Sequence, residues 1–107
     1  VVTPRDSFPP EAPDNVVAVV VPASAQTAAQ VELSWAISPE PDLAGYHVYR
    51  SEKEGERGER LSGELLLTPA FRDICVLGGR RYFYTVTALD RAGNESGAGV
   101  AIAAEIP

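Results

Sequence analysis

The chain has 107 residues, of which 45% are hydrophobic, and a formal net charge of −6. This length is enough for one hydrophobic core and too short for two, and the acidic balance makes nucleic acid and anionic membrane surfaces poor partners. No apolar run approaches the roughly 20 residues that a membrane-spanning helix needs, and the single cysteine, Cys75, excludes an internal disulfide.

The first 13 residues hold four prolines and show no periodicity. Proline fixes φ and removes an amide donor, so we interpret residues 1–13 as an extended interdomain linker or arm. Phe8 is the one aromatic residue in it, and it either docks onto the domain or belongs to a mobile tail. The start of the chain also lacks the basic-then-apolar pattern of a signal peptide.

The remaining residues, 14–107, contain stretches with the composition or the period-two alternation of β-strands. These stretches span residues 15–21, 30–36, 46–50, 65–71, 82–90 and 100–106. The fourth contains Pro69, which confines it to a sheet edge or an irregular strand. The fifth, Tyr-Phe-Tyr-Thr-Val-Thr-Ala-Leu-Asp, is the strongest because aromatic and β-branched residues alternate between two turns.

The connections between these strands are short or irregular. Residues 37–45 contain Pro39, Pro41 and Asp42, and residues 51–63 are charged with three glycines, so both are predicted to be loops. No helical pattern occurs anywhere in the sequence. Six or seven short strands in about 100 residues favour an all-β, two-sheet antiparallel sandwich over a closed barrel.

Five segments occur in a fixed order along this pattern. Residues 13–16 read Pro-Asp-Asn-Val, and residues 31–35 read Val-Glu-Leu-Ser-Trp. Residues 45–50 read Gly-Tyr-His-Val-Tyr-Arg, residues 79–88 follow Gly-x-x-Tyr-x-Tyr-x-Val-x-Ala, and residues 90–96 read Asp-Arg-Ala-Gly-Asn-Glu-Ser. Together they resemble the immunoglobulin-like fibronectin type III domain, in the style common among bacterial members. The resemblance implies sheets of three and four strands, with no catalytic site, metal or cofactor.

The same pattern predicts the core. Trp35 can bury a large apolar area, which dominates the energetics of a small core. Tyr82 is expected to form a tyrosine corner, with its hydroxyl bonded to backbone within residues 75–79, although Gly78 stands where the family usually has proline. The residues predicted to lie between the sheets are Val16, Ala18, Val20, Val31, Leu33, Trp35, Tyr46, Val48, Phe71, Tyr82, Tyr84, Val86, Ala88, Val100 and Ile102.

Few residues could carry catalysis. His47 is out of phase with the inward residues, which predicts a half-exposed position in a strand. Cys75 is expected to be a small, semi-buried apolar residue near the corner. A nucleophile–base pair of these two would need the fold to bring together elements that a sandwich separates. The chain is therefore predicted not to be an enzyme.

The acidic residues of the loops are Asp42, Asp73, Asp90 and Glu95. Calcium needs several oxygen ligands that converge, and these residues lack the close alternating spacing of a calcium loop. Aspartate is also an ordinary residue for closing turns through bonds to its own backbone. We therefore predict that these acids close turns.

Two outward-facing sets of residues are more apolar or aromatic than a solvent-exposed surface requires. Tyr49 and Phe83 are predicted to be exposed on the central sheet, together with two threonines of the same face, and aromatic residues are enriched at binding surfaces. Val17, Val19 and Val21 form a second apolar face of the first strand, so something should cover them. These five residues are predicted to be a possible partner surface.

The resemblance favours a non-catalytic spacer or interaction module of a secreted or envelope-associated multidomain bacterial protein. The alternative is a ligand-binding domain, with glycan as one candidate, that uses loops 37–44 and 90–97; an enzyme is a remote alternative. Those loops offer no aromatic ring on which a sugar could stack. The expected partners are neighbouring domains or another protein, without membrane insertion, and the isolated chain is expected to be a monomer.

Overall fold

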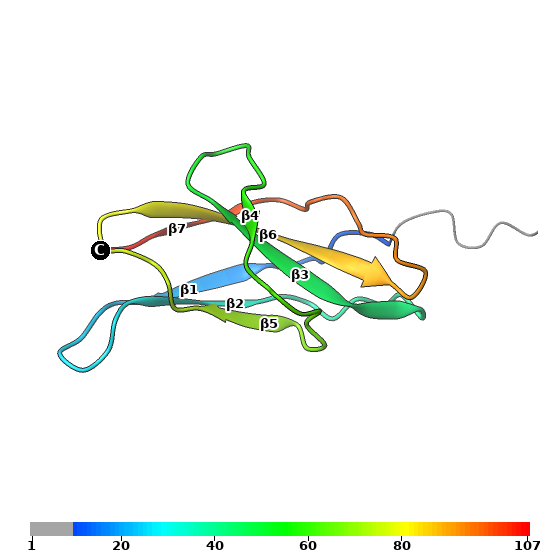
Figure 1. The fold of residues 1–107 in the computed structure, drawn as a ribbon, viewed down its shortest axis with the longest axis horizontal. Coiled ribbons are helices and arrows are strands. Elements are labelled where there is room, and N and C mark those ends of the chain that lie inside the picture. The colour runs from blue at the N-terminus through cyan, green and yellow to red at the C-terminus, as the bar shows by residue number, and fades with distance from the viewer. Residues whose placement is uncertain (1–9) are drawn as a thin grey trace, which may run out of the picture.

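The computed structural model describes residues 10–107, which form two packed antiparallel sheets (Figure 1). One sheet has the order β1-β2-β5 and the other the order β4-β3-β6-β7. The described residues contain no helix and hence none that could span a membrane. The predicted all-β sandwich is confirmed. Its strands are β1 (Val17–Val21), β2 (Gln30–Ser34), β3 (Leu43–Ser51), β4 (Glu59–Arg60), β5 (Ala70–Asp73), β6 (Arg81–Asp90) and β7 (Ile102–Glu105).

The two longest strands, β3 and β6, pair along almost their whole length, from Leu43 opposite Asp90 to Ser51 opposite Phe83. β3 begins within residues 37–45, which were predicted to be irregular, because the Asp90 end of β6 continues far enough to pair with Leu43. A hairpin with a long loop, residues 52–58, then leads from β3 to β4. Gly58 has φ 77° there, and a side chain at this position would collide with the Arg50 carbonyl.

The six residues predicted as the structural core are all buried. Trp35 packs edge-on against Tyr46, with ring centroids 5.3 Å apart, and so joins the two sheets. Val100 was predicted to be buried, and this is wrong, because it is 82% exposed. Residues 97–101 precede β7 without joining its ladder, and Ala104 and Ile106 fill the core instead. The six core residues are Trp35, Tyr46, Val48, Tyr82, Tyr84 and Val86.

The tyrosine corner is present without the proline that is usual in the family. The Leu77 N–H donates to the Tyr82 hydroxyl at 3.0 Å. The following turn uses Gly79 at φ 78°, and its N–H donates to the Ile106 carbonyl at 2.8 Å. These bonds fix the last residues of the chain beside the turn that begins β6.

The described part of the predicted arm packs on the sandwich. Pro10 and Pro13 are buried, and a side chain on Gly99 would come within 3.2 Å of the Ala12 Cβ. Phe8, which was expected to dock or to be mobile, lies outside the described residues. The boundary between arm and domain therefore stays a prediction.

Candidate functional site

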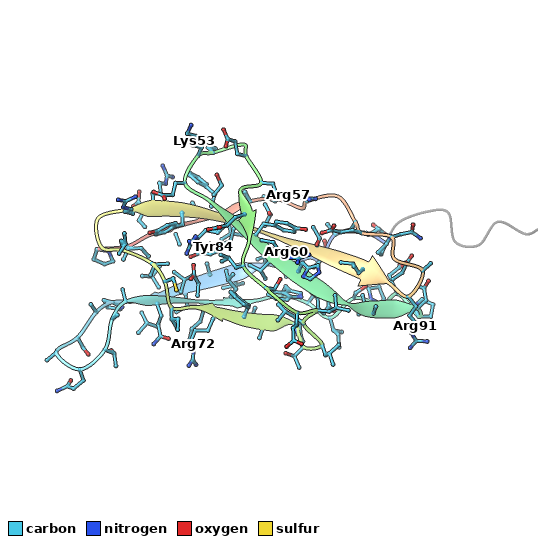
Figure 2. The ribbon with its side chains drawn as sticks, in the orientation of Figure 1. Lys53, Arg57, Arg60, Arg72, Tyr84 and Arg91 are labelled. Carbon is cyan, nitrogen blue, oxygen red and sulfur yellow. The ribbon has the colours of Figure 1, made fainter. Side chains whose placement is uncertain are left out.

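The outer face of the four-stranded sheet is covered by the hairpin of residues 52–60 and by the segment after β6 (Figure 2). Tyr49 and Phe83, predicted to be exposed, are only 7% and 8% exposed, so that prediction is wrong. The physical reason is arginine stacking: the Arg57 guanidinium lies 4.3 Å from the Tyr49 ring centroid, and that of Arg81 lies 5.3 Å from the Phe83 centroid.

Glu95 ties this face together. Its Oε2 accepts hydrogen bonds from the Tyr49 hydroxyl at 2.6 Å and from the Thr87 hydroxyl at 2.7 Å. Burial alone would raise the pKa of Glu95, but the bonds from Thr87 and Tyr49 hold that pKa below its ordinary value. Glu95 was predicted to close a turn; it instead clamps the segment after β6 to β3 and β6.

His47 was predicted to be half exposed, and this is wrong, because it is 7% exposed. Ser62 lies over it, and its hydroxyl oxygen is 2.9 Å from His47 Nδ1. The same hydroxyl accepts the Val48 N–H at 3.0 Å, so its own proton is free to be donated to a neutral imidazole. Burial and the nearby Arg60 lower the pKa of His47, which favours the neutral ring.

A second polar cluster joins the two sheets through Asp73, which is 4% exposed. Asp73 Oδ2 accepts from the Tyr84 hydroxyl at 2.7 Å and from Arg50 at 2.9 Å. Asp73 Oδ1 accepts the Cys75 N–H at 3.1 Å, so this residue also closes a turn, as predicted. Burial and the Asp73 carboxylate raise the pKa of the Tyr84 phenol.

Asp90 closes the turn after β6, as predicted. Its Oδ1 accepts the N–H groups of Ala92 at 3.0 Å and of Asn94 at 2.9 Å, and the turn contains Gly93 at φ 92°. Burial alone would raise the pKa of Asp90. These hydrogen bonds outweigh that effect, so the pKa lies below its ordinary value. The backbone carbonyl of Asp42 accepts the Arg91 N–H at 2.9 Å, which joins the loops 37–44 and 90–97 at one end of the sandwich.

Cys75 was predicted to be semi-buried and is exposed. The neighbouring Val76 takes the inward position instead, at 6% exposed. His47 lies on the outer face of the four-stranded sheet, whereas Cys75 follows β5 of the other sheet, so the fold does not pair them. Within residues 10–107, no three His, Cys, Asp or Glu side chains converge as metal ligands.

The outer face of the three-stranded sheet is open. Val17 and Val19 are 50% and 52% exposed, and Val21 is half-buried. A shallow groove of about 440 Å³ beside Val19 is crossed by the exposed ion pair of Glu32 and Arg72, whose charged atoms are 3.5 Å apart. The role of the valines as a partner surface stays a prediction.

Sequence reasoning missed both polar clusters. Tyr49 is 46 residues from its partner Glu95, and Arg50 is 23 residues from its partner Asp73, so no local spacing links the members of either cluster. The sequence held one indication of them. Tyr82 and Tyr84 lie on the inward-facing side of the alternation in β6, and a buried phenol needs a hydrogen-bond partner.

Comparison with solved structures identifies the fold. An Fn3-like protein from Clostridium thermocellum matches with a TM-score of 0.73 at 24% identity, over 92% of this chain and 94% of that one. The chain has the fibronectin type III fold. This fold is usually non-catalytic. No family model matches the sequence.

Two curated relatives contain a segment similar to this fibronectin type III domain. An amylopullulanase of Thermoanaerobacterium thermosulfurigenes is 37% identical over 93 residues, which is 87% of this chain. An amylopullulanase of Thermoanaerobacterium saccharolyticum is 36% identical over 92 residues, or 86% of this chain. The chain spans only 4% and 6% of the lengths of these relatives. It therefore resembles a small part of much longer bacterial proteins.

Proposed function

We propose that this domain is a non-catalytic spacer or interaction module of a secreted or envelope-associated multidomain bacterial protein. The proposal rests on how the chain aligns with a longer protein. Of this chain, 87% matches a segment that makes up only 4% of an amylopullulanase. A segment of that proportion accompanies other domains. Secretion or envelope attachment rests on the family resemblance.

The polar side chains support this role because they bond to one another. A catalytic acid or base must reach a substrate. Asp73 and Asp90 are 4% and 3% exposed, and their oxygens already accept hydrogen bonds within the domain. His47 lies under Ser62, 2.9 Å from its hydroxyl oxygen, and the half-buried Glu95 carboxylate accepts hydrogen bonds from Tyr49 and Thr87. These groups stabilise the sandwich.

The positions of the two chain ends also support a spacer. Pro10 and Pro13 pack at the end where Asp14 accepts the Ala36 N–H at 2.9 Å. Ile106 is held by Gly79 and Arg80 at the opposite end (Figure 1). Two neighbours joined to these ends would be separated by the length of the sandwich.

The test is single-molecule energy transfer between a donor and an acceptor fluorescent domain fused to the two ends of the full chain. A spacer gives one narrow transfer distribution that disappears when the domain is unfolded by denaturant. A Gly–Ser linker of equal length is the matched control and gives a broad distribution. A distribution as broad as that of the linker would contradict the spacer role.

The glycan-binding alternative is tested separately by NMR titration of the chain with pullulan and amylopectin, chosen from the kind of protein to which it is similar. We expect no saturable shift, because loops 37–44 and 90–97 have no ring on which a sugar could stack. Saturable shifts confined to these loops would replace the spacer with the ligand-binding function.

A further inference from the structure

A polar groove lies on the outer side of the four-stranded sheet. It has a volume of about 350 Å³ and lies between Arg57 of the hairpin of residues 52–60, Thr85 of β6 and the segment 98–101. Thr85 is directly opposite Tyr49 on the neighbouring strand, and the Arg57 guanidinium lies 4.3 Å from the Tyr49 ring centroid. Figure 2 shows Arg57 at the hairpin, on the outer side of this sheet. The fold therefore holds the guanidinium close to Thr85, because opposite residues share one face of a sheet.

Thr85 contributes a hydroxyl group that the domain itself does not bond. Thr85 is only 6% exposed, and its Oγ1 has no hydrogen-bond partner within residues 10–107. Thr87, two residues further along the same face, differs from it because its hydroxyl donates to Glu95. A buried hydroxyl without a partner destabilises a fold, so the presence of Thr85 in the groove needs a reason other than stability.

Arg57 is a positioned cation without a carboxylate partner. Four other arginines form ion pairs with acidic side chains: Arg50, Arg72, Arg80 and Arg81. In the described part of the chain Arg57 forms no such pair. Glu95 is near enough for the charge of Arg57 to lower its pKa, but its Oε2 is already bonded to two hydroxyl groups. Stacking uses the face of the guanidinium and leaves the N–H donors at its edge for a ligand.

The third side of the groove is backbone that has left the sheet. Four steps along β6, from Tyr84 to Ala88, are matched by six steps along the facing chain, from Ile102 back to Ser96. The two extra residues displace the segment between them from the ladder, as in a β-bulge. As a result, no N–H group of residues 98–101 donates to another described residue. Unpaired backbone of this kind can bond to the main chain of an extended peptide.

The guanidinium, the hydroxyl and the backbone N–H groups can all donate, so they suit a ligand that accepts hydrogen bonds. One guanidinium balances one negative charge, which favours a carboxylate over a doubly charged phosphate. A single exposed ion pair contributes little to binding, so the carboxylate needs a larger ligand that also contacts the backbone.

We propose that Arg57, Thr85 and the backbone of residues 98–101 bind an aspartate or glutamate side chain within an extended segment of a partner protein. This inference rests on the interaction-module part of the proposed function and gives the chemistry of the partner. The guanidinium edge and the Thr85 hydroxyl would bond the carboxylate, and the segment would bond the main chain of the partner.

The test is an NMR titration of the full chain at fixed ionic strength with two peptides that differ in one group, Ac-Thr-Val-Glu-Val-Thr-NH2 and Ac-Thr-Val-Gln-Val-Thr-NH2. The glutamate peptide should give saturable shifts at Thr85 and at residues 98–101, with a Kd at least about tenfold lower than that of the glutamine peptide. A tetramer of galacturonic acid is the third probe, because it carries carboxylates on a sugar. Equal affinities of the two peptides, no saturable shift with either, or tighter binding of the sugar acid would overturn the proposal.

Two variants locate the site. Arg57→Gln should remove the preference for the glutamate peptide, whereas Arg91→Gln, which removes the same charge from an exposed position in another loop, should retain it. Thr85→Val should weaken binding of the glutamate peptide by at least about threefold and leave the urea midpoint unchanged or higher, because no partner loses a bond. A lower urea midpoint for Thr85→Val, or loss of the preference in Arg91→Gln, would overturn the site. A narrow energy-transfer distribution in the same case would leave the spacer function standing.

Discussion

The two outer faces of the sandwich are both built from strands with alternating side chains, but they differ in how far those side chains are exposed to solvent. On the four-stranded sheet, Tyr49 and Phe83 are 7% and 8% exposed. On the three-stranded sheet, Val17 and Val19 are 50% and 52% exposed. Alternation determines which side chains share a face, whereas the covering segments determine whether that face meets solvent.

The polar groups differ between the faces in the same way. On the covered face, the buried Thr87 and Tyr49 hydroxyls both donate to the Glu95 carboxylate, and a buried polar group without such a partner would be destabilising. The pair of Glu32 and Arg72 on the open face has side chains that are 46% and 62% exposed. Such exposed pairs contribute little to stability. The covered face should therefore be sensitive to substitution and the open face tolerant.

The largest effect is expected beneath both faces, in the shared core. Trp35→Ala should lower the free energy of unfolding by about 3–5 kcal/mol through the cavity that it leaves. Tyr82→Phe removes one bond and should cost less, about 1–3 kcal/mol, by leaving the Leu77 N–H without its partner. Denaturant titration measures both. A larger loss for Tyr82→Phe than for Trp35→Ala would show that the corner, and not the tryptophan, dominates.

The comparison of the faces is tested directly by one substitution on each. Tyr49→Phe keeps the ring under Arg57 but removes a bond to Glu95, and should cost about 1–2 kcal/mol. Val19→Thr on the open face should change stability by less than about 0.5 kcal/mol. The midpoints of urea denaturation measure the difference. Equal effects would mean that the cover over Tyr49 does not persist in solution.

A smaller, pH-dependent effect is expected from His47 on the covered face. Its pKa is lowered from 6.5, so the unfolded chain binds the proton more readily than the folded domain. The stability that the neutral ring provides is therefore present above about pH 6.5 and is lost as the pH falls toward the lowered pKa. His47→Gln should remove this part of the slope in melts between about pH 7.5 and 5.5. Parallel slopes in the two proteins would contradict the assignment.

The smallest effect on stability is expected from removing residues 1–9, which ends the deletion before the buried Pro10. If the predicted arm shields Val17, Val19 and Val21, the truncated chain should self-associate through these apolar side chains, with a nearly unchanged melting temperature. Analytical ultracentrifugation of the full and truncated chains measures this. A truncated chain that stays monomeric at high concentration would show that the arm is not the cover, and Val19→Lys in the truncated chain is the control that should abolish any association.

The sequence by itself determined the sandwich and most of its core, and its resemblance to the fibronectin type III domain implied the division into three and four strands. Periodicity is a local property, so the alternation around Leu33, Trp35, Tyr84 and Val86 is sufficient to place these residues inward. The corner at Tyr82 and the turn at Asp90 were also predictable, because their partners lie within a few residues along the chain.

Only the tertiary structure decided what happens on the outward faces and at the strand ends. The burial of Tyr49 and His47 depends on Arg57, Ser62 and Glu95, which come from other segments. Val100 is outside the core because β7 starts later than its alternation indicates. These contacts join residues distant in sequence, and a one-dimensional pattern carries no information on which loop folds over which strand.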